Sequence, residues 1–282
     1  MIIWLASYPK SGNTWVRHFL ASLIYSNQRK NGLDKLGFIL QYPKKDQFEK
    51  LVSDLNDFNQ IRKNWIRSQN IINYDNKIKI FKTHHSLCTL DEDNFTNEEN
   101  TLGAIYIVRD PRNVISSILY HFNLTNIEEA LNFLKDEKKF IGNLKNKTNY
   151  PLLTLIGSWK SNYNSWKHIG KNFLLVKYED LILNPNNEFK RIANHISKLI
   201  NIKFSEEQIK QSVEESSFKN LSNLEDKNGF VESIKSSENR RKKFFNLGPK
   251  NNWKEMLDKK YVKEIESSFN SEMKEFGYIL KN

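Results

Sequence analysis

The residues with the clearest chemical potential form one short string near the start of the chain, Tyr8-Pro9-Lys10-Ser11-Gly12-Asn13-Thr14-Trp15. The string joins a short apolar run to a stretch with helical spacing. Backbone N–H groups at the start of a helix point toward a bound anion, and the helix dipole adds partial positive charge there. Lys10 adds a full positive charge. The side-chain donors are Ser11, Asn13 and Thr14. The string therefore predicts a site for phosphate or a similar anion, although an ordinary turn capped by Ser or Thr has the same outline.

The position of the lysine distinguishes this loop from that of P-loop kinases. Their signature, G-x-x-x-x-G-K-[ST], places lysine directly after the second glycine. Here Lys10 precedes Gly12, which argues against an ATP-dependent kinase or NTPase. That class stays an alternative, because Asp110 follows an apolar run as a metal-binding aspartate would.

A second group of candidates, Arg109, Asp110 and Ser117, begins where the apolar run 103–108 ends. Arginine offers a planar fork of donors that suits a phosphate. Ser117 stands two turns into the helix that is expected from Pro111, and it must face the loop to share a ligand with Arg109. The alternative is a local ion pair between Arg109 and Asp110.

A third candidate is a histidine at the end of a strand, within Phe81-Lys82-Thr83-His84-His85. A neutral imidazole at such a place accepts a proton from a reacting hydroxyl or amine. The residue types alone do not distinguish His84 from His85, and a lone histidine is more often structural.

Together these strings resemble the family of sulfotransferases that use 3′-phosphoadenosine 5′-phosphosulfate (PAPS). The loop at 8–15 resembles the family's 5′-phosphosulfate-binding loop, and the string at 104–117 resembles its 3′-phosphate-binding element. The resemblance implies that Lys10 contacts the oxygen between phosphate and sulfate, and that Arg109 and Ser117 bind the 3′-phosphate. It further implies contacts to the 5′-phosphate and the adenine from Ser11, Gly12, Asn13, Thr14 and Trp15.

The same resemblance extends to later parts of the chain. The family's catalytic base follows Lys-Thr, which points to His84. Tyr178, within 174–181, matches a tyrosine that reaches the adenine side of the nucleotide. Ser216-Ser217-Phe218 resembles an element whose phenylalanine packs on the adenine, so Ser216 and Phe218 join the expected donor site.

The last matching element, at 244–253, departs from the family pattern. Gly248 and Trp253 keep the family's spacing, but Asn246 stands where the family has arginine. This puts the usual contact between a lid arginine and the 3′-phosphate in doubt. The basic run Arg240-Arg241-Lys242-Lys243 lies upstream and is a candidate source of the missing charge, and the alternative is that it forms a solvated surface.

The activity that the resemblance implies is transfer of a sulfuryl group from PAPS to a hydroxyl or an amine by in-line displacement. Lys10 would stabilise the leaving oxygen, and His84 would take the proton of the acceptor. We expect no metal, because no carboxylate cluster or histidine pair has the spacing of metal ligands. The acceptor is expected to be a small molecule or a glycan, and it stays open among a phenol, a lipid-like alcohol and a sugar. The oligomeric state also stays open.

The elements that must position these residues follow from the apolar patterns. Buried strands are predicted at 2–7, 77–82, 103–108 and 172–177, and helices at 14–26, 111–122 and 185–199. Alternating strands and helices predict a three-layer α/β fold, with a parallel central sheet flanked by helices and a P-loop-like nucleotide site. Ligands of such sheets bind at the carboxyl ends of the strands. The candidates at 8–14, 82–85, Arg109-Asp110 and Tyr178 are therefore expected along one rim.

We expect residues 1–282 to form a single sulfotransferase domain. Segments 28–75 and 222–252 are polar and are expected to be irregular. The first is predicted to lie on the acceptor side and the second to form a lid. Aromatic residues of the first segment are expected to line the acceptor pocket, namely Phe38, Tyr42, Phe48, Trp65 and Tyr74.

Composition limits the partners and the location. The 282 residues carry a net charge of +11, which favours anionic partners. A basic nucleic-acid-binding protein is the non-enzymatic alternative, but the chain has no signature of a nucleic-acid module, and no nucleic-acid partner is expected. The one cysteine, Cys88, excludes an intrachain disulfide. Without a signal-like start or an apolar stretch of about 18 residues, we expect no membrane span and a cytoplasmic location.

Overall fold

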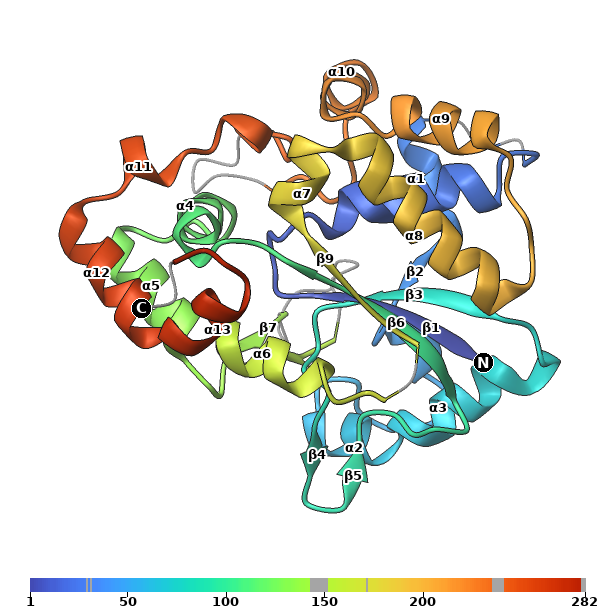
Figure 1. Cartoon of the computed structure of the whole chain (residues 1–282). Coiled ribbons are helices and arrows are strands. Elements are labelled where there is room, and N and C mark those ends of the chain that lie inside the picture. Colours follow the sequence, from blue (N-terminus) through green and yellow to red (C-terminus); the bar gives the residue numbers. More distant parts are fainter. Residues whose placement is uncertain (29, 31, 143–151, 171, 235–240, 280–282) are drawn as a thin grey trace.

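A five-stranded parallel sheet forms the centre of the computed structural model, which describes residues 1–28, 30, 32–142, 152–170, 172–234 and 241–279. The strand order is β2-β3-β1-β6-β9, and every neighbouring pair is parallel. The strands are β1 (Ile2–Ser7), β2 (Leu40–Gln41), β3 (Lys79–Thr83), β6 (Thr101–Val108) and β9 (Phe173–Lys177). Figure 1 shows these strands crossing the middle of the molecule with helices on both sides. The predicted α/β fold is confirmed.

The sequence of β1 explains its central place. All six of its side chains are buried, so both faces of the strand must be covered. Successive side chains point to opposite faces of a sheet. Trp4 accordingly packs in one apolar cluster, and Ile3 and Leu5 pack in a second cluster on the other face. These two clusters are the layers of core between the sheet and its helices.

The same clusters divide the helices between the two faces. Helices α1 (Asn13–Ile24), α8 (Pro185–Ile200) and α9 (Glu206–Glu215) pack in the cluster of Ile3 and Leu5. The cluster of Trp4 holds residues of α2 (Phe58–Lys63), α3 (Trp65–Ile72), α4 (Pro111–His121), α5 (Ile127–Lys135), α6 (Trp159–Trp166), α12 (Lys259–Ser268) and α13 (Asn270–Glu275). In Figure 1, α1 and α8 lie above the strands, and α3 and α6 lie below them.

Shorter elements complete the described chain. The remaining α-helices are α7 (Tyr178–Leu183), α10 (Phe218–Asn228) and α11 (Trp253–Met256). Two small antiparallel pairs join β4 (Thr89–Leu90) to β5 (Asp93–Asn94) and β7 (Phe140–Ile141) to β8 (Thr154–Leu155). The 3₁₀ helices are η1 (Gly32–Phe38), η2 (Lys45–Gln47), η3 (Asn73–Asp75) and η4 (Gly248–Lys250).

The predicted strands and helices agree with the structure to within a few residues. The four predicted strands are β1, β3, β6 and β9, and the three predicted helices are α1, α4 and α8. The edge strand β2 is not predicted, because two residues in a polar segment carry no readable period.

The prediction that segment 28–75 is irregular is wrong, since it contains η1, β2, η2, α2, α3 and η3. Polar residues here cap helices instead of forming loops. The Asp57 carboxylate accepts the backbone N–H groups of Asn59 and Gln60 at the start of α2, which satisfies donors that a helix leaves open.

The aromatic residues of this segment also differ from expectation. Tyr42, Phe48 and Trp65 are fully buried in the core, so the prediction that they line an acceptor pocket is wrong. Phe38 stacks on Tyr25 with ring centroids 4.8 Å apart. These rings stabilise the fold beside the edge strand, which explains why a polar segment holds them.

Segment 222–252 is likewise not uniformly irregular. Its first part belongs to α10, which ends at Asn228, and Gly248–Lys250 form η4. Arg240 lies outside the described residues.

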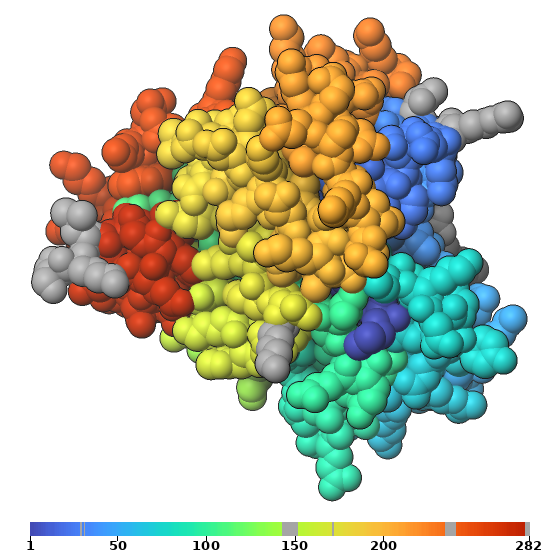
Figure 2. Space-filling model, turned by 45° about the vertical axis from the view of Figure 1, so that its right-hand side comes forward, coloured from blue at the N-terminus to red at the C-terminus, as the bar shows by residue number. Residues whose placement is uncertain are grey.

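The C-terminal helices pack against α6. The rings of Tyr163 and Phe276 have centroids 4.6 Å apart, and those of Trp159 and Phe269 are 5.2 Å apart. Figure 2 shows the red C-terminal residues directly beside the yellow-green ones. Within the described ranges, no helix has the length and apolar character needed to cross a membrane.

Candidate active site

The carboxyl ends of the central strands bring the predicted site residues to one rim. A Cβ added to Gly12 would lie 2.5 Å from the Tyr178 ring, so the loop after β1 and the start of α7 are in direct contact. The Arg109 guanidinium lies 4.2 Å from the centroid of the Tyr178 ring. Its Nη1 donates a hydrogen bond of 3.2 Å to the carbonyl of Lys10. Three separate stretches therefore meet here, as predicted.

The loop after β1 has an unusual backbone. Lys10 has φ of 67° and Gly12 has φ of 101°, and a lysine rarely adopts the left-handed region. The Asn13 amide donates to the carbonyl of Leu5 and to Ser7 Oγ, at 3.0 and 3.1 Å. Asn13 therefore holds the loop to the strand and does not point outward as a ligand donor. A backbone strained at this place is typical of a functional loop.

Several polar groups in and around this loop have no hydrogen-bond partner within the described residues. Ser11 Oγ, Trp15 Nε1 and Arg109 Nε are buried and make no hydrogen bond. A buried polar group without a partner costs about 1–3 kcal/mol. Hydroxyl, indole and guanidinium N–H or O–H groups beside a lysine are the donor set of an anionic nucleotide site, so these residues fit a nucleotide that carries phosphates.

Lys10 is held by two residues that are not among the predicted site residues. Its Nζ lies 3.5 Å from His121 Nδ1 and 4.1 Å from the centroid of the Phe244 ring. Burial, together with the charges of Arg109 and Lys82, lowers the pKa of Lys10 to about 7. His121 follows Ser117 by four residues, which is the spacing of neighbours on one helix face. That spacing was the available signal.

The two neighbouring histidines have different surroundings. His84 Nδ1 lies 2.8 Å from the carbonyl of Ser7. A carbonyl accepts only, so Nδ1 carries the proton and Nε2 has a free lone pair. Burial and the charge of Lys82 lower the pKa of His84 to about 3, which keeps the ring neutral.

His85 belongs to the core. It is fully buried, and its ring stacks on Phe95 with centroids 4.3 Å apart. Its Nδ1 lies 2.7 Å from the carbonyl of Ser86. Of the two histidines, only His84 is partly exposed at the rim.

A buried charge cluster lies on the same rim. The Glu232 carboxylate pairs with Arg17 Nη1 at 2.5 Å and with Lys82 Nζ at 3.4 Å. Lys82 is two residues before His84 on the same predicted strand, so its place at the rim can be predicted. Its ion pair with Glu232 joins residues 150 positions apart in the sequence. No local pattern in the sequence marks Glu232 or Arg17 as site residues.

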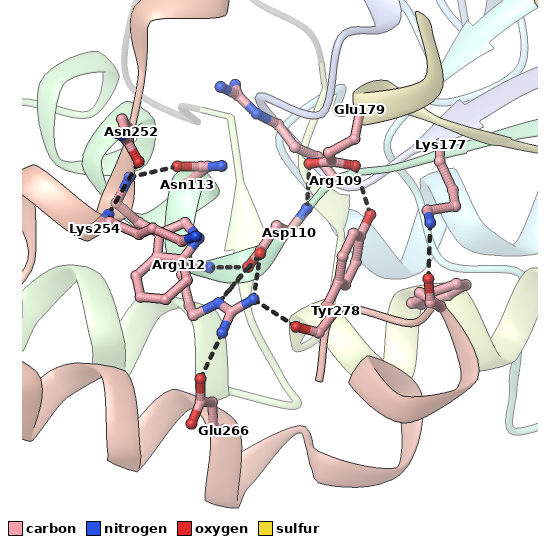
Figure 3. Close-up of polar contacts among 12 residues, drawn as sticks. Arg109, Asp110, Arg112, Asn113, Lys177, Glu179, Asn252, Lys254, Glu266 and Tyr278 are labelled. Atoms are coloured by element: carbon pink, nitrogen blue, oxygen red, sulfur yellow. Dashed lines mark hydrogen bonds and ion pairs between the residues drawn. The ribbon is translucent and has the colours of Figure 1, made fainter. Parts of the chain in front are cut away.

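Arg109 does not form the local ion pair that was the alternative prediction. The Asp110 carboxylate instead pairs with Arg112 at 2.7 Å, and Asp110 caps α4 through the Arg112 N–H. Figure 3 shows Arg112 also reaching Glu266 and Tyr278, while the Arg109 guanidinium points away from this network. Asp110 is thus committed to structure, which removes the feature that supported a kinase.

The elements expected on the adenine side meet one another. A Cβ added to Gly248, which has φ of 53°, would lie 2.1 Å from the Phe218 ring. Trp15 packs edge-on against Tyr178, with ring centroids 5.8 Å apart. The Ser216 hydroxyl donates to the carbonyl of Ser212 at 2.8 Å, so it closes α9 and is not a free donor.

The described part of the basic run has partners of its own. Arg241 donates to the carbonyl of Phe230 at 2.6 Å, and Lys243 pairs with Asp226 at 2.7 Å. Lys242 Nζ donates to the carbonyl of Tyr120 at 3.1 Å. These contacts fasten the segment and do not direct its charges to Arg109 or Ser117. Across the residues that the structure describes, no three His, Cys, Asp or Glu side chains are grouped to hold a metal ion.

Comparisons with known proteins agree on one family. A family model described as a sulfotransferase domain matches residues 2–277. Cytosolic sulfotransferase 7 of Arabidopsis thaliana is 25% identical, over 78% of this chain and 64% of that protein. Flavonol 3-sulfotransferase of Flaveria bidentis is 26% identical, over 99% of this chain and 84% of that protein.

Solved structures show the same fold. Retinol dehydratase in a complex with retinol and PAP aligns with a TM-score of 0.60 and 17% identity, over 97% of this chain and 81% of that one. Mouse sulfotransferase SULT7A1 complexed with PAP aligns with a TM-score of 0.56 and 18% identity, over 97% and 84%.

Proposed function

The chain belongs to the sulfotransferase domain family and is a PAPS-dependent sulfotransferase, and from this premise we propose which residues bind the donor, which take part in the transfer and what the acceptor is. The donor supplies the sulfuryl group. Lys10, Ser11, Thr14 and the backbone around Gly12 bind its 5′ end, and Asn13 holds the loop to β1. Arg109 and Ser117 bind its 3′-phosphate. The adenine side is formed by Trp15, Tyr178, Phe218 and Gly248, with Ser216 as a structural support.

The observation that carries this proposal is the group of buried donors without partners. Ser11 Oγ lies within the Lys10–Gly12 loop, and the Arg109 guanidinium contacts this loop at the Lys10 carbonyl. The Tyr178 ring at the start of α7 packs against both. A polyanion satisfies these donors and offsets the positive charges that lower the pKa of Lys10.

We assign the proton acceptor of the reaction to His84. Its Nδ1 proton is committed to the carbonyl of Ser7, so Nε2 is free to accept the proton of the attacking group. Anions bound near Lys82 and Lys10 raise its low pKa toward the useful range. Lys10 stabilises the charge that develops on the leaving oxygen, an effect of about 3–4 kcal/mol for a positioned donor.

The acceptor is a hydroxyl or amine of a small molecule or a glycan. The similarity to a flavonol sulfotransferase supports a small molecule. We propose that residues 1–282 act as one domain, that segment 28–75 lies beside the acceptor and segment 222–252 over the site, and that the enzyme works in the cytoplasm without a metal.

A binding assay followed by a transfer assay tests this function. PAP without metal should raise the melting temperature of the protein more than ATP with Mg²⁺ does. Transfer of labelled sulfate from PAPS should then be screened over phenols, amines, lipid-like alcohols and sugars. Stabilisation by ATP with Mg²⁺ alone would contradict the donor assignment.

A further inference from the structure

The side chain of Asn251 is buried against helix α4. It is only 7% exposed, and its Nδ2 donates to the carbonyl of Asn113 at 2.8 Å and to Ser117 Oγ at 3.1 Å. Its Oδ1 accepts a hydrogen bond of 2.9 Å from Ser116 Oγ. The amide cannot be reversed, because Oδ1 would then face the carbonyl oxygen of Asn113. Its orientation is therefore fixed.

This contact decides what the Ser117 hydroxyl does. A serine oxygen accepts from Asn251 on one side, which leaves the hydroxyl hydrogen for another partner. Within the described residues, the partner of that hydrogen is the carbonyl of Asn113, at a long 3.5 Å, and this oxygen already accepts from Asn251. Ser117 is partly exposed, so its hydrogen is available to a ligand. A hydroxyl that accepts one hydrogen bond is also a stronger donor.

The geometry of α4 gives the direction of that hydrogen. Residues four apart lie on one helix face, so Asn113, Ser117 and His121 form a strip. His121 contacts Lys10 at the end of this strip. Ser117 therefore faces the same rim as the donor loop. Asn251, in the segment that precedes α11, packs against it.

We propose that Asn251 is a positioning residue that orients the Ser117 hydroxyl toward the 3′-phosphate of the donor. This inference rests on the proposed donor site. The arginine expected at position 246 is absent, and Asn246 is exposed. The end of the proposed lid segment thus acts on the 3′-phosphate indirectly, through the neutral amide of Asn251 and the Ser117 hydroxyl of α4. The Trp253 N–H donates to Asn113 Oδ1 at 2.9 Å, which anchors the segment in place.

The test compares two nucleotides that differ only in the 3′-phosphate. Calorimetry measures the Kd of PAP and of AMP for the wild type and for Asn251→Ala and Asn251→Asp. We expect Asn251→Ala to weaken PAP by about 10-fold, the size of one hydrogen bond to a charged group, with AMP nearly unchanged. Asn251→Asp should weaken PAP further, because its carboxylate takes the Ser117 hydrogen and repels phosphate.

A double-mutant cycle separates positioning from simple structural support. In a Ser117→Ala background, Asn251→Ala should have little further effect on the ratio of the PAP and AMP constants. Asn252→Ala is the matched control, because within the described residues the hydrogen bonds of that amide go to Glu255 and the Lys254 N–H of the adjoining helix. It should leave the ratio unchanged.

The outcomes are distinct. A wild-type protein that binds PAP and AMP equally overturns the proposed 3′-phosphate site and this inference with it. A wild type that prefers PAP, with the same preference in Asn251→Ala, overturns the inference alone. Equal losses for PAP and AMP, or additive losses in the cycle, also overturn it, because they show a structural role.

Discussion

The hydrogen bond from His84 Nδ1 to the Ser7 carbonyl leaves Nε2 of His84 free to accept a proton. The neighbouring His85 is buried in the core, so substitutions of the two histidines should have different effects. Replacing His84 with Ala removes the free Nε2, so we expect kcat to fall by about 100-fold or more. His85→Phe keeps the ring stack on Phe95 and loses only the contact to the Ser86 carbonyl. It should retain kcat and lose about 1–2 kcal/mol of stability. Transfer from labelled PAPS and denaturant unfolding measure the two effects. Near-normal turnover in His84→Ala would reassign the base.

The low pKa of Lys10 predicts a pH dependence of nucleotide binding. PAP prefers the charged lysine, so binding raises the pKa and takes up a proton. Affinity should be full below a pH of about 7 and should fall as the pH rises above it, by up to about 100-fold near pH 9. Groups facing this ammonium are Arg109, Lys82, His121, Glu225 and Glu232.

The control for this dependence is Lys10→Arg, whose guanidinium stays charged over the whole range. It should bind PAP with little change between pH 6 and pH 9, within about a factor of three. Calorimetry in buffers of different ionisation enthalpy measures the proton uptake directly. An unchanged pH profile in Lys10→Arg would mean that another group titrates.

At the level of the loop and its neighbouring helix, the close contact between Gly12 and Tyr178 gives a third prediction. Gly12→Ala must move a ring that lies 2.5 Å from the new Cβ, so Tyr178 and the Arg109 guanidinium packed on it should shift. We expect PAP to bind about 10-fold more weakly or worse, with about 1–3 kcal/mol of lost stability. Gly170→Ala is the matched control.

Gly170 has φ of 92° and no atom within 4 Å of the added Cβ. Gly170→Ala introduces backbone strain without a clash. The variant protein should therefore be less stable than the wild type but bind PAP with the same affinity. Equal affinity in both variants would show that the Tyr178 contact does not shape the donor site.

The parts that were predictable from sequence are those with a local signal. Buried strands such as β1 are short apolar runs. The loop at 8–15 comes directly after β1 in the sequence, so its place at the end of that strand can be predicted. The contacts of Lys10 with His121 and of Asn251 with Ser117 join distant parts of the chain, and no local pattern specifies them. Tyr42 and Trp65 were misassigned because aromatic residues in a polar segment fill either a pocket or a core.

Across the whole molecule, Glu232 joins its own segment to two elements far apart in sequence. Its carboxylate pairs with Arg17 of α1 and with Lys82 of β3. The Arg17 side chain also donates to the carbonyls of Leu36 and Ile39. The segment that carries Glu232 is thereby fixed to the first helix and to the strand that ends at the active site. The two cations are 8% and 9% exposed, so they depend on this carboxylate for compensation.

Glu232→Gln should therefore destabilise the protein by about 1–2 kcal/mol, less than a fully buried pair because the Glu232 side chain is 26% exposed. Burial alone would raise the pKa of Glu232, but Lys82 and Arg17 outweigh it and lower the pKa to about 2. A lowered folded-state pKa gives stability that is present above the unfolded value and lost as the pH falls toward the folded one. The difference in melting temperature between wild type and variant should thus be constant from pH 7 to about pH 5 and shrink below about pH 4.5. Glu206→Gln, which breaks the exposed pair with Lys190, should leave the melting temperature nearly unchanged. An equal effect of both substitutions would mean that the charge cluster at Glu232 does not hold these elements together.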